Sequence, residues 1–215
     1  AGSKLIFDQA VSLGTINNGS NATWTISDQG VASVGQNLIV GSQNSAQPTA
    51  PRITVTGSGS TLGVGSLTFY RGEVSVLDSA ALTTGTLSVG PRINNGSATL
   101  LVADAGSRLT ANGAVTLGAS PGPGIVTLAR GGVLEANSSF TVGAATAVGV
   151  LNIGGGEAAA AVDAGVLDTA TVTLGAAGRL NFNHTGTDYA FAPTIAGAGT
   201  IKVAAGTTRL TGTSM

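Results

Sequence analysis

A four-residue phrase recurs along this chain: an apolar residue, any residue, a second apolar residue and glycine. Its six copies begin at Leu38, Leu62, Leu87, Val115, Phe140 and Val172, roughly 24 to 32 residues apart. A period in this range is typical of solenoid proteins, in which one repeat cannot bury its apolar face alone and stacks on its neighbours. The repeat therefore predicts a stacked fold that presents long surfaces rather than one deep pocket.

Within each repeat the apolar residues alternate with polar ones, which is the period of a β-strand. Three such segments follow one another in each repeat, and one residue in two is expected to point inward. In three successive repeats the expected inward residues are Leu67, Phe69, Val74, Val76 and Leu82; Leu87, Val89, Leu100, Val102, Leu109 and Ala111; and Val115, Leu117, Val126, Leu128, Leu134 and Ala136. The residues between them, such as Ser88, Thr116, Thr141 and Thr173, are expected to face water.

These patterns predict an all-β fold, a right-handed parallel β-helix with three short strands per rung. One-sided burial is unusual in flat parallel sheets, but it fits sheets that surround a shared core. Seven or eight rungs, spaced by about 4.8 Å, predict a rod of roughly 35 Å. Residues 1–215 are expected to form a single β-helix domain. We interpret the chain as a fragment of a longer protein, because no leader precedes Ala1 and Met215 directly follows Thr-Ser.

Composition excludes several classes of protein. Hydrophobic residues make up 42% of the chain and its net charge is only −1, which is not the profile of a disordered protein. Lys4 and Lys202 are the only lysines, so the basic stripe of a nucleic-acid binder and the basic cluster of a lipid binder are both missing. Cysteine is absent, which excludes disulfides and thiolate metal sites. No apolar run is long enough to span a membrane.

Irregular segments are expected in two kinds of place. Residues 157–162 (EAAAAV) form the one helix-like segment, which is too short to be stable alone and is expected to lie in a loop after three glycines. Insertions at Ser42–Pro51, Pro91–Asn95 and Ser120–Gly124 follow the same strand in their repeats. We expect them to project from one edge of the rod and to form a contact surface.

The last third of the chain carries a more specific phrase. It reads Leu180-Asn181-Phe182-Asn183-His184-Thr185, followed by Asp188-Tyr189, Phe191, Ile195–Ile201 and Ala205–Gly212. This segment resembles the passenger region of bacterial autotransporters, especially adhesins of the diffuse-adherence type, and the preceding repeats resemble the same family. The resemblance implies a β-helix on the bacterial surface, or secreted, that is exported through a C-terminal outer-membrane barrel. It also implies a role in adhesion, autoaggregation or biofilm formation.

His184 is the only histidine, and Asp188 lies close to it in the sequence. A catalytic histidine needs a nucleophile and an orienting acid within reach, but no serine stands in a strained Gly-x-Ser-x-Gly turn. We interpret His184 as a polar turn residue that caps a strand together with Asn183.

Asp78 and Asp104 follow equivalent strands, and Arg130 follows the next one. Stacked carboxylates could bind a cation, or act as acid and base on a polysaccharide together with Glu135. The arginine in the third place favours a solvated ladder at the edge of the rod, in which Arg130 offsets the charge of Asp104. We therefore predict no catalytic, metal or cofactor residue.

Asparagines end two successive third strands, at Asn112 and Asn137. Because asparagine tolerates the left-handed conformation, both are expected to have positive φ and to stack on each other. The Asn-x-Ser/Thr sequences at Asn95 and Asn183 are interpreted as chance matches in a chain rich in these residues. Trp24 and Ile26 share a strand face and are expected in the core.

Two hypotheses of function follow. The first is a non-enzymatic adhesive module whose partner is a host-cell or neighbouring bacterial surface, protein or glycan, with self-association as a further possibility. The second is a lyase or glycosidase on a β-helix scaffold, which would need carboxylates that converge on one face. The scarcity and dispersion of acidic residues favour the first.

Overall fold

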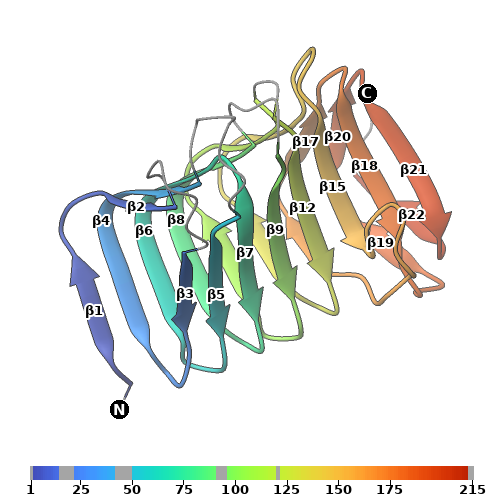
Figure 1. Ribbon diagram of the computed structural model, residues 1–215. Coiled ribbons are helices and arrows are strands. Elements are labelled where there is room, and N and C mark those ends of the chain that lie inside the picture. The colour runs from blue at the N-terminus through green and yellow to red at the C-terminus, as the bar shows by residue number, and fades with distance from the viewer. Residues whose placement is uncertain (1, 15–21, 42–49, 91–95, 120–121, 213–215) are drawn as a thin grey trace.

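The computed structural model describes residues 2–14, 22–41, 50–90, 96–119 and 122–212. In this part of the chain all regular elements are strands, which lie side by side from the N-terminal to the C-terminal end (Figure 1). Every pairing between named strands is parallel. The prediction of an all-β stack of parallel strands, as in a β-solenoid, is confirmed.

One sheet has eight strands, and it faces the viewer in Figure 1. In stacking order its members are β3 (Thr23–Ile26), β5 (Arg52–Thr56), β7 (Gly72–Leu77), β9 (Ala98–Ala103), β12 (Gly124–Ala129), β15 (Gly149–Gly154), β18 (Gly178–Asn183) and β21 (Thr200–Ala205). Each strand pairs with the strand one repeat further along the chain, so the backbone hydrogen bonds join residues that are distant in sequence.

A second sheet has twelve strands. Its members are β1 (Lys4–Phe7), β2 (Val11–Leu13), β4 (Val31–Val40), β6 (Thr61–Phe69), β8 (Ala81–Val89), β10 (Arg108–Ala111), β11 (Val115–Leu117), β13 (Val133–Ala136), β14 (Phe140–Val142), β16 (Val166–Asp168), β17 (Thr171–Leu174) and β20 (Thr194–Gly197). Strands β4, β6 and β8 are long. In later repeats two shorter strands occupy the equivalent positions, and β10 and β11, for example, both pair with β8. Two further strands, β19 (Tyr189–Phe191) and β22 (Thr208–Leu210), pair with each other.

The inward rows of these sheets form one continuous hydrophobic core. All the inward residues predicted for the three central repeats are buried; the eight at its centre are Leu87, Val89, Leu100, Val102, Val115, Leu117, Val126 and Leu128. Strand pairing places residues of one row directly above each other, as with Leu100 and Val126. A parallel ladder keeps each side chain on the same face of the sheet in every repeat, which is why a simple alternation in the sequence was sufficient to identify the core.

Trp24 departs from the prediction, because it is only partly buried although Ile26 lies in the core. Its strand, β3, is the last strand of the eight-stranded sheet, so no further layer covers the indole. The ring packs edge-on against Phe7 of β1, with centroids 6.0 Å apart. The opposite end is similarly open, and Ile201 and Val203 of β21 are 43% and 58% exposed.

The segment at residues 157–162 is a loop, as predicted, and contains no helix. It belongs to a longer excursion, residues 155–165, between β15 and β16. The three insertions expected on one edge fall mainly on residues 42–49, 91–95 and 120–121, which lie outside the described part of the chain. Their common position therefore stays a prediction.

We predict that Val102→Asp strongly destabilises the fold, because it places a charge in a fully buried row. The loss should exceed about 3 kcal/mol in the free energy of unfolding, measured by urea denaturation. The matched control is Leu101→Asp, since Leu101 precedes Val102 on the same strand and is partly exposed. Equal losses in both variants would contradict the assignment of inward and outward rows.

Candidate binding surfaces

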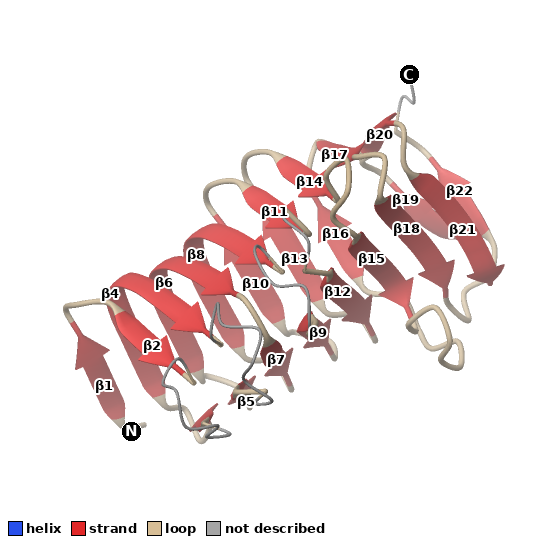
Figure 2. Cartoon of the chain, turned by 45° about the horizontal axis from the view of Figure 1, so that its top comes forward, coloured by secondary structure: helices blue, strands red, loops and turns tan. Residues whose placement is uncertain are grey.

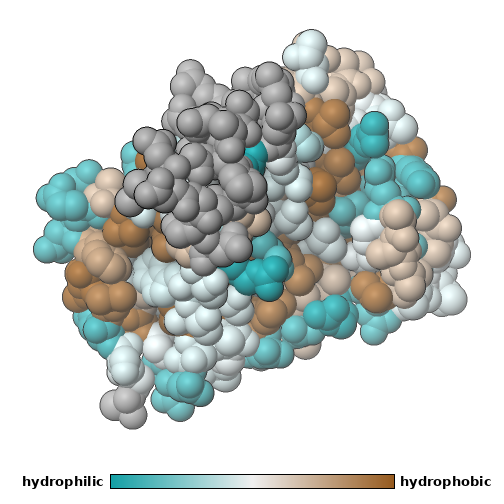
Figure 3. Space-filling view, in the orientation of Figure 1, coloured by the Kyte–Doolittle hydropathy of each residue, from teal (hydrophilic) through white to brown (hydrophobic). Residues whose placement is uncertain are grey.

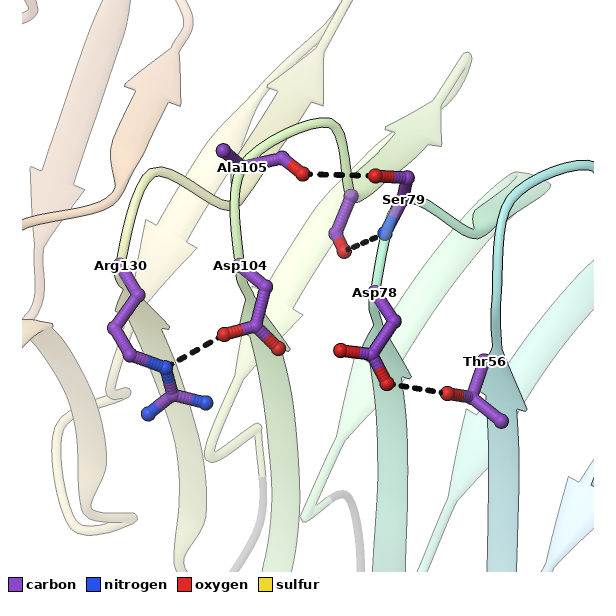
Figure 4. A network of polar contacts seen from close by, with 7 residues as sticks. Thr56, Asp78, Ser79, Asp104, Ala105 and Arg130 are labelled. Atoms are coloured by element: carbon purple, nitrogen blue, oxygen red, sulfur yellow. Dashed lines mark hydrogen bonds and ion pairs between the residues drawn. The ribbon is translucent and has the colours of Figure 1, made fainter.

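The predicted edge ladder exists, and it lies at the turns that follow β5, β7, β9 and β12. Figure 4 shows Thr56, Asp78, Asp104 and Arg130 side by side on neighbouring strand ends. Arg130 Nε donates to Asp104 Oδ1 at 2.6 Å, and Thr56 Oγ1 donates to Asp78 Oδ2 at 2.7 Å. The hydrogen bond from Arg130 lowers the pKa of Asp104, although partial burial opposes this, and Asp104 in turn raises the pKa of Arg130.

These charged residues also form the turns of the backbone at this edge. Asp78, Asp104 and Arg130 have φ values of 52°, 74° and 49°, in the left-handed region. Each takes part in a tight turn closed by a backbone hydrogen bond, such as that from Ala80 N to Leu77 O at 3.1 Å. Aspartate adopts this conformation more readily than most residues, because its short polar side chain can bond locally. The turn geometry accounts for the aspartates without a ligand.

Asn112 and Asn137 do stack, since Nδ2 of Asn137 donates to Oδ1 of Asn112 at 3.3 Å. The prediction of positive φ at these two positions is wrong, because neither has a left-handed backbone. Their N–H groups instead continue the parallel ladder and donate to Thr84 O and Ala111 O. The left-handed residues other than glycine lie at the turns after β3, β7, β9 and β12, where the chain leaves the eight-stranded sheet. We call these turns, which include Asp78, Asp104 and Arg130, the aspartate corner.

The prediction that His184 is a polar turn residue capping a strand is wrong, because His184 is fully buried and forms a parallel bridge with Val162. Its Nε2 lies 2.8 Å from Thr208 Oγ1, and its ring lies 5.0 Å from that of Tyr189. Burial lowers the pKa of His184, and burial raises the pKa of Tyr189 to about 12. Asp188 pairs with Arg209 at 3.4 Å, and no contact between Asp188 and the imidazole is found among the described residues. The structure therefore does not assemble the histidine–aspartate pair.

Two outward residues of β18 are also buried, which alternation alone did not predict. Asn181 is 0% and Asn183 is 3% exposed, because residues 155–165 cover this part of the eight-stranded sheet. Asn183 Nδ2 donates to the carbonyl oxygens of Gly156 and Ala159 at 2.9 and 3.0 Å, and Asn181 donates to Asn152 at 3.2 Å. The amide of Asn183 is thus engaged in the fold and is closed to glycan attachment in the folded chain.

Glu135 and Asp168 lie opposite each other on β13 and β16. They line a shallow polar hollow of ≈ 390 Å³ that also includes Asn137 and Thr169. Arg108 Nη1 lies 2.6 Å from Glu135 Oε2 and offsets its charge. Across the described residues, no three histidine, cysteine, aspartate or glutamate side chains gather in a way that could hold a metal ion. No described helix has the length and hydrophobicity needed to cross a membrane.

The most regular surface is formed by β11, β14, β17 and the C-terminal halves of β6 and β8, which Figure 2 brings forward. We call it the hydroxyl face. One row contains Thr68, Ser88, Thr116, Thr141 and Thr173, joined by strand pairing. Two residues earlier along the chain, a second row contains Ser66, Thr86, Ser139 and Thr171, with Ala114 in the place between Thr86 and Ser139. Within a row the side chains repeat about every 4.8 Å, and the rows lie about 6.6 Å apart.

The hydroxyl face carries no charged residue, although the chain has nineteen. The five ion pairs of the described residues all lie elsewhere. In contrast, the visible part of the eight-stranded sheet in Figure 3 alternates between hydrophilic and hydrophobic patches. The sequence predicted that Ser88, Thr116, Thr141 and Thr173 face water, but not that they and their neighbours form one uncharged surface. The signal was present in the second residue of the repeat phrase, which is serine or threonine in the copies that begin at Leu87, Val115, Phe140 and Val172.

We predict that the stability of the fold falls as the pH drops below about 6.5, the ordinary pKa of an unfolded histidine. Because the folded pKa of His184 is lower, the unfolded chain binds a proton that the folded chain excludes. The penalty grows until the pH reaches the folded pKa. Thermal unfolding between pH 7.5 and 5 should show a smaller decrease in melting temperature for His184→Gln than for the native chain. Parallel curves would contradict a neutral buried imidazole.

We also predict that conformation matters more than charge at the aspartate corner. Asp104→Asn keeps a residue that tolerates positive φ and removes an exposed ion pair, so it should cost less than about 1 kcal/mol. Asp104→Val should cost about 1–2 kcal/mol more, because a β-branched residue is strained there. The two free energies of unfolding, compared at pH 7, check this ordering.

Comparison of the chain with protein-family models, with curated proteins and with solved structures finds no match in any of the three.

Proposed function

We propose that this chain is a β-helical passenger module of a bacterial autotransporter, displayed on the cell surface or secreted, that acts without catalysis in adhesion, autoaggregation or biofilm formation. Its partner is the surface of a host cell or of a neighbouring bacterium. The single observation that carries this proposal is the hydroxyl face, a long, regular and uncharged surface on a rigid scaffold.

We further propose that the stack is a right-handed β-helix with three strands per rung. The registers support this, because three consecutive strands advance by a similar step. Leu100 pairs with Val126, Leu109 with Leu134, and Val115 with Phe140, each 25 or 26 residues further on. Right-handed connections are the rule for parallel strands joined by a crossover, which supports the handedness.

The chemistry of the hydroxyl face suits contact with a neutral, hydroxyl-rich surface. Threonine and serine offer donors and acceptors on short side chains, which lose little conformational entropy on binding. Threonine also supplies methyl groups that can pack on the apolar faces of sugar rings. Each contact is weak, but a rigid array presents many of them simultaneously, and the combined affinity can greatly exceed that of one contact.

The absence of catalysis in this proposal is supported by the way the acidic residues are used. Asp104 and Glu135 are each paired with an arginine, and Asp78 accepts a hydrogen bond from Thr56. Incubation of the purified chain with pectin, alginate and peptidoglycan should release no product. Product release that is lost in Asp104→Asn would favour the alternative, a polysaccharide-active enzyme.

The adhesive role can be tested by adding charge to the hydroxyl face. Thr116 and Thr141 lie opposite each other in its centre, and lysine at both positions would place two long cations on an otherwise uncharged surface. Beads coated with Thr116→Lys/Thr141→Lys should bind cultured epithelial cells and each other at least about tenfold less than beads coated with the native chain, since one lost contact of about 1.4 kcal/mol already has this effect.

The matched control is Thr61→Lys/Thr83→Lys, which adds the same charge to outward positions on the N-terminal halves of β6 and β8, away from the hydroxyl face. Its binding and clumping should equal those of the native chain, and all three proteins should share one far-UV circular dichroism spectrum. Equal losses in both double variants would show a general effect of charge. Full binding by Thr116→Lys/Thr141→Lys would contradict the role of this face.

A further inference from the structure

Arg71 is the one arginine of the described residues that has no carboxylate partner, and it is also buried. It lies between β6 and β7 and is only 8% exposed. The other five described arginines each form an ion pair with an acidic residue: Arg52 with Glu73, Arg108 with Glu135, Arg130 with Asp104, Arg179 with Glu157 and Arg209 with Asp188. Those five side chains are roughly half exposed, so the chain pairs its exposed arginines and leaves the buried one unpaired.

The guanidinium of Arg71 packs against Gly96, and the Arg71 backbone packs against Gly41. Its Nε is enclosed and has no hydrogen-bond partner. A Cβ atom at Gly96 would lie 2.4 Å from this nitrogen, and one at Gly41 would lie 2.8 Å from the Arg71 backbone nitrogen. Both glycines have positive φ, of 141° and 81°. Any other residue at position 96 would therefore displace the guanidinium.

A guanidinium with an enclosed, unpaired Nε and no carboxylate partner is unfavourable in the chain alone. Arginine does not lose its proton, so it cannot escape the penalty by becoming neutral. Replacing such a charge by an apolar residue of similar volume is often neutral or stabilising. A ligand that supplies the missing negative charge and acceptor atoms removes the penalty when it binds.

We propose that Arg71 anchors a binding site for a carboxylate group. The guanidinium is planar and offers parallel N–H donors, which match the two oxygens of a carboxylate. Its single positive charge, with no second cation paired to it in the described surroundings, matches the single negative charge of a carboxylate better than the double charge of a sulfate or phosphate ion. Arg71 lies outside the hydroxyl face, so this site is independent of the adhesive role.

The first test compares melting temperatures at pH 7 and constant ionic strength, with sodium chloride replaced stepwise by sodium acetate or sodium glucuronate. The native chain should melt roughly 5 °C higher at a concentration about 100 times Kd, and the rise should saturate. Arg71→Met should show no saturable rise, while the control Arg108→Gln should keep it. A rise of the same size in Arg71→Met would overturn the proposal.

The same variants separate a ligand anchor from a structural cation. In chloride alone, Arg71→Met should melt at the same temperature as the native chain or higher, because it removes an uncompensated charge and keeps much of the apolar stem. A variant that melts lower by the same amount with and without carboxylate would show that Arg71 only supports the fold, and would overturn the proposal.

A second measurement needs no substitution. The ¹H–¹⁵N signal of Arg71 Nε, in the native chain, should move saturably when glucuronate or acetate is added. An effect of glucuronate alone would identify a sugar acid as the source of the carboxylate, and an equal effect of acetate would show that the carboxylate suffices. A signal that moves with sulfate but with neither carboxylate would overturn the assignment of the ligand.

Discussion

The rest of this structure depends on the ladder of backbone hydrogen bonds between strands that lie one repeat apart. Val115, for example, lies between Leu87 and Phe140 in the stack. In a parallel pair the side chains of equivalent positions lie on the same face. Each repeat must therefore have an apolar residue at the positions where the neighbouring repeats have one. This is why the apolar pattern recurs along the sequence about every 25 residues. The core, the outward rows and the turns are regular because the ladder places equivalent residues of successive repeats next to each other.

The ladder also decides where charge can be placed. Stacked positions lie about 4.8 Å apart, so a charge is always close to the same position of the next layer. Arg52 and Glu73 use this proximity for an ion pair in register, and Asp104 and Arg130 use it at a turn. Such exposed pairs contribute little to stability. In both pairs, opposite charges occupy neighbouring layers, and the five ion pairs of the described residues all lie outside the hydroxyl face.

The corners show how far turn chemistry can be predicted. Besides glycine, the chain offers two kinds of residue that tolerate positive φ: asparagine at Asn112 and Asn137, and aspartate at Asp78 and Asp104. The sequence does not say which corner is tight. Apart from glycines, the structure places the left-handed residues at the turns that contain the aspartates, because the chain there turns within a hydrogen-bonded turn of four residues. At the asparagines the backbone simply continues the ladder, and only their amides behave as predicted.

The sequence by itself determined the class of fold, the inward rows and the stacking of equivalent positions, because the periods of two residues and of about 25 residues are properties of the chain alone. It also indicated that Arg130 compensates Asp104, since their spacing matches one repeat. Only the tertiary structure decided which outward-facing residues of the sheets are covered by other segments. Asn181 and His184 are buried because a loop more than twenty residues earlier and a strand more than twenty residues later close over them. Arg71 is buried without a partner for the same reason: burial and pairing depend on which distant segments meet, and no local pattern records that.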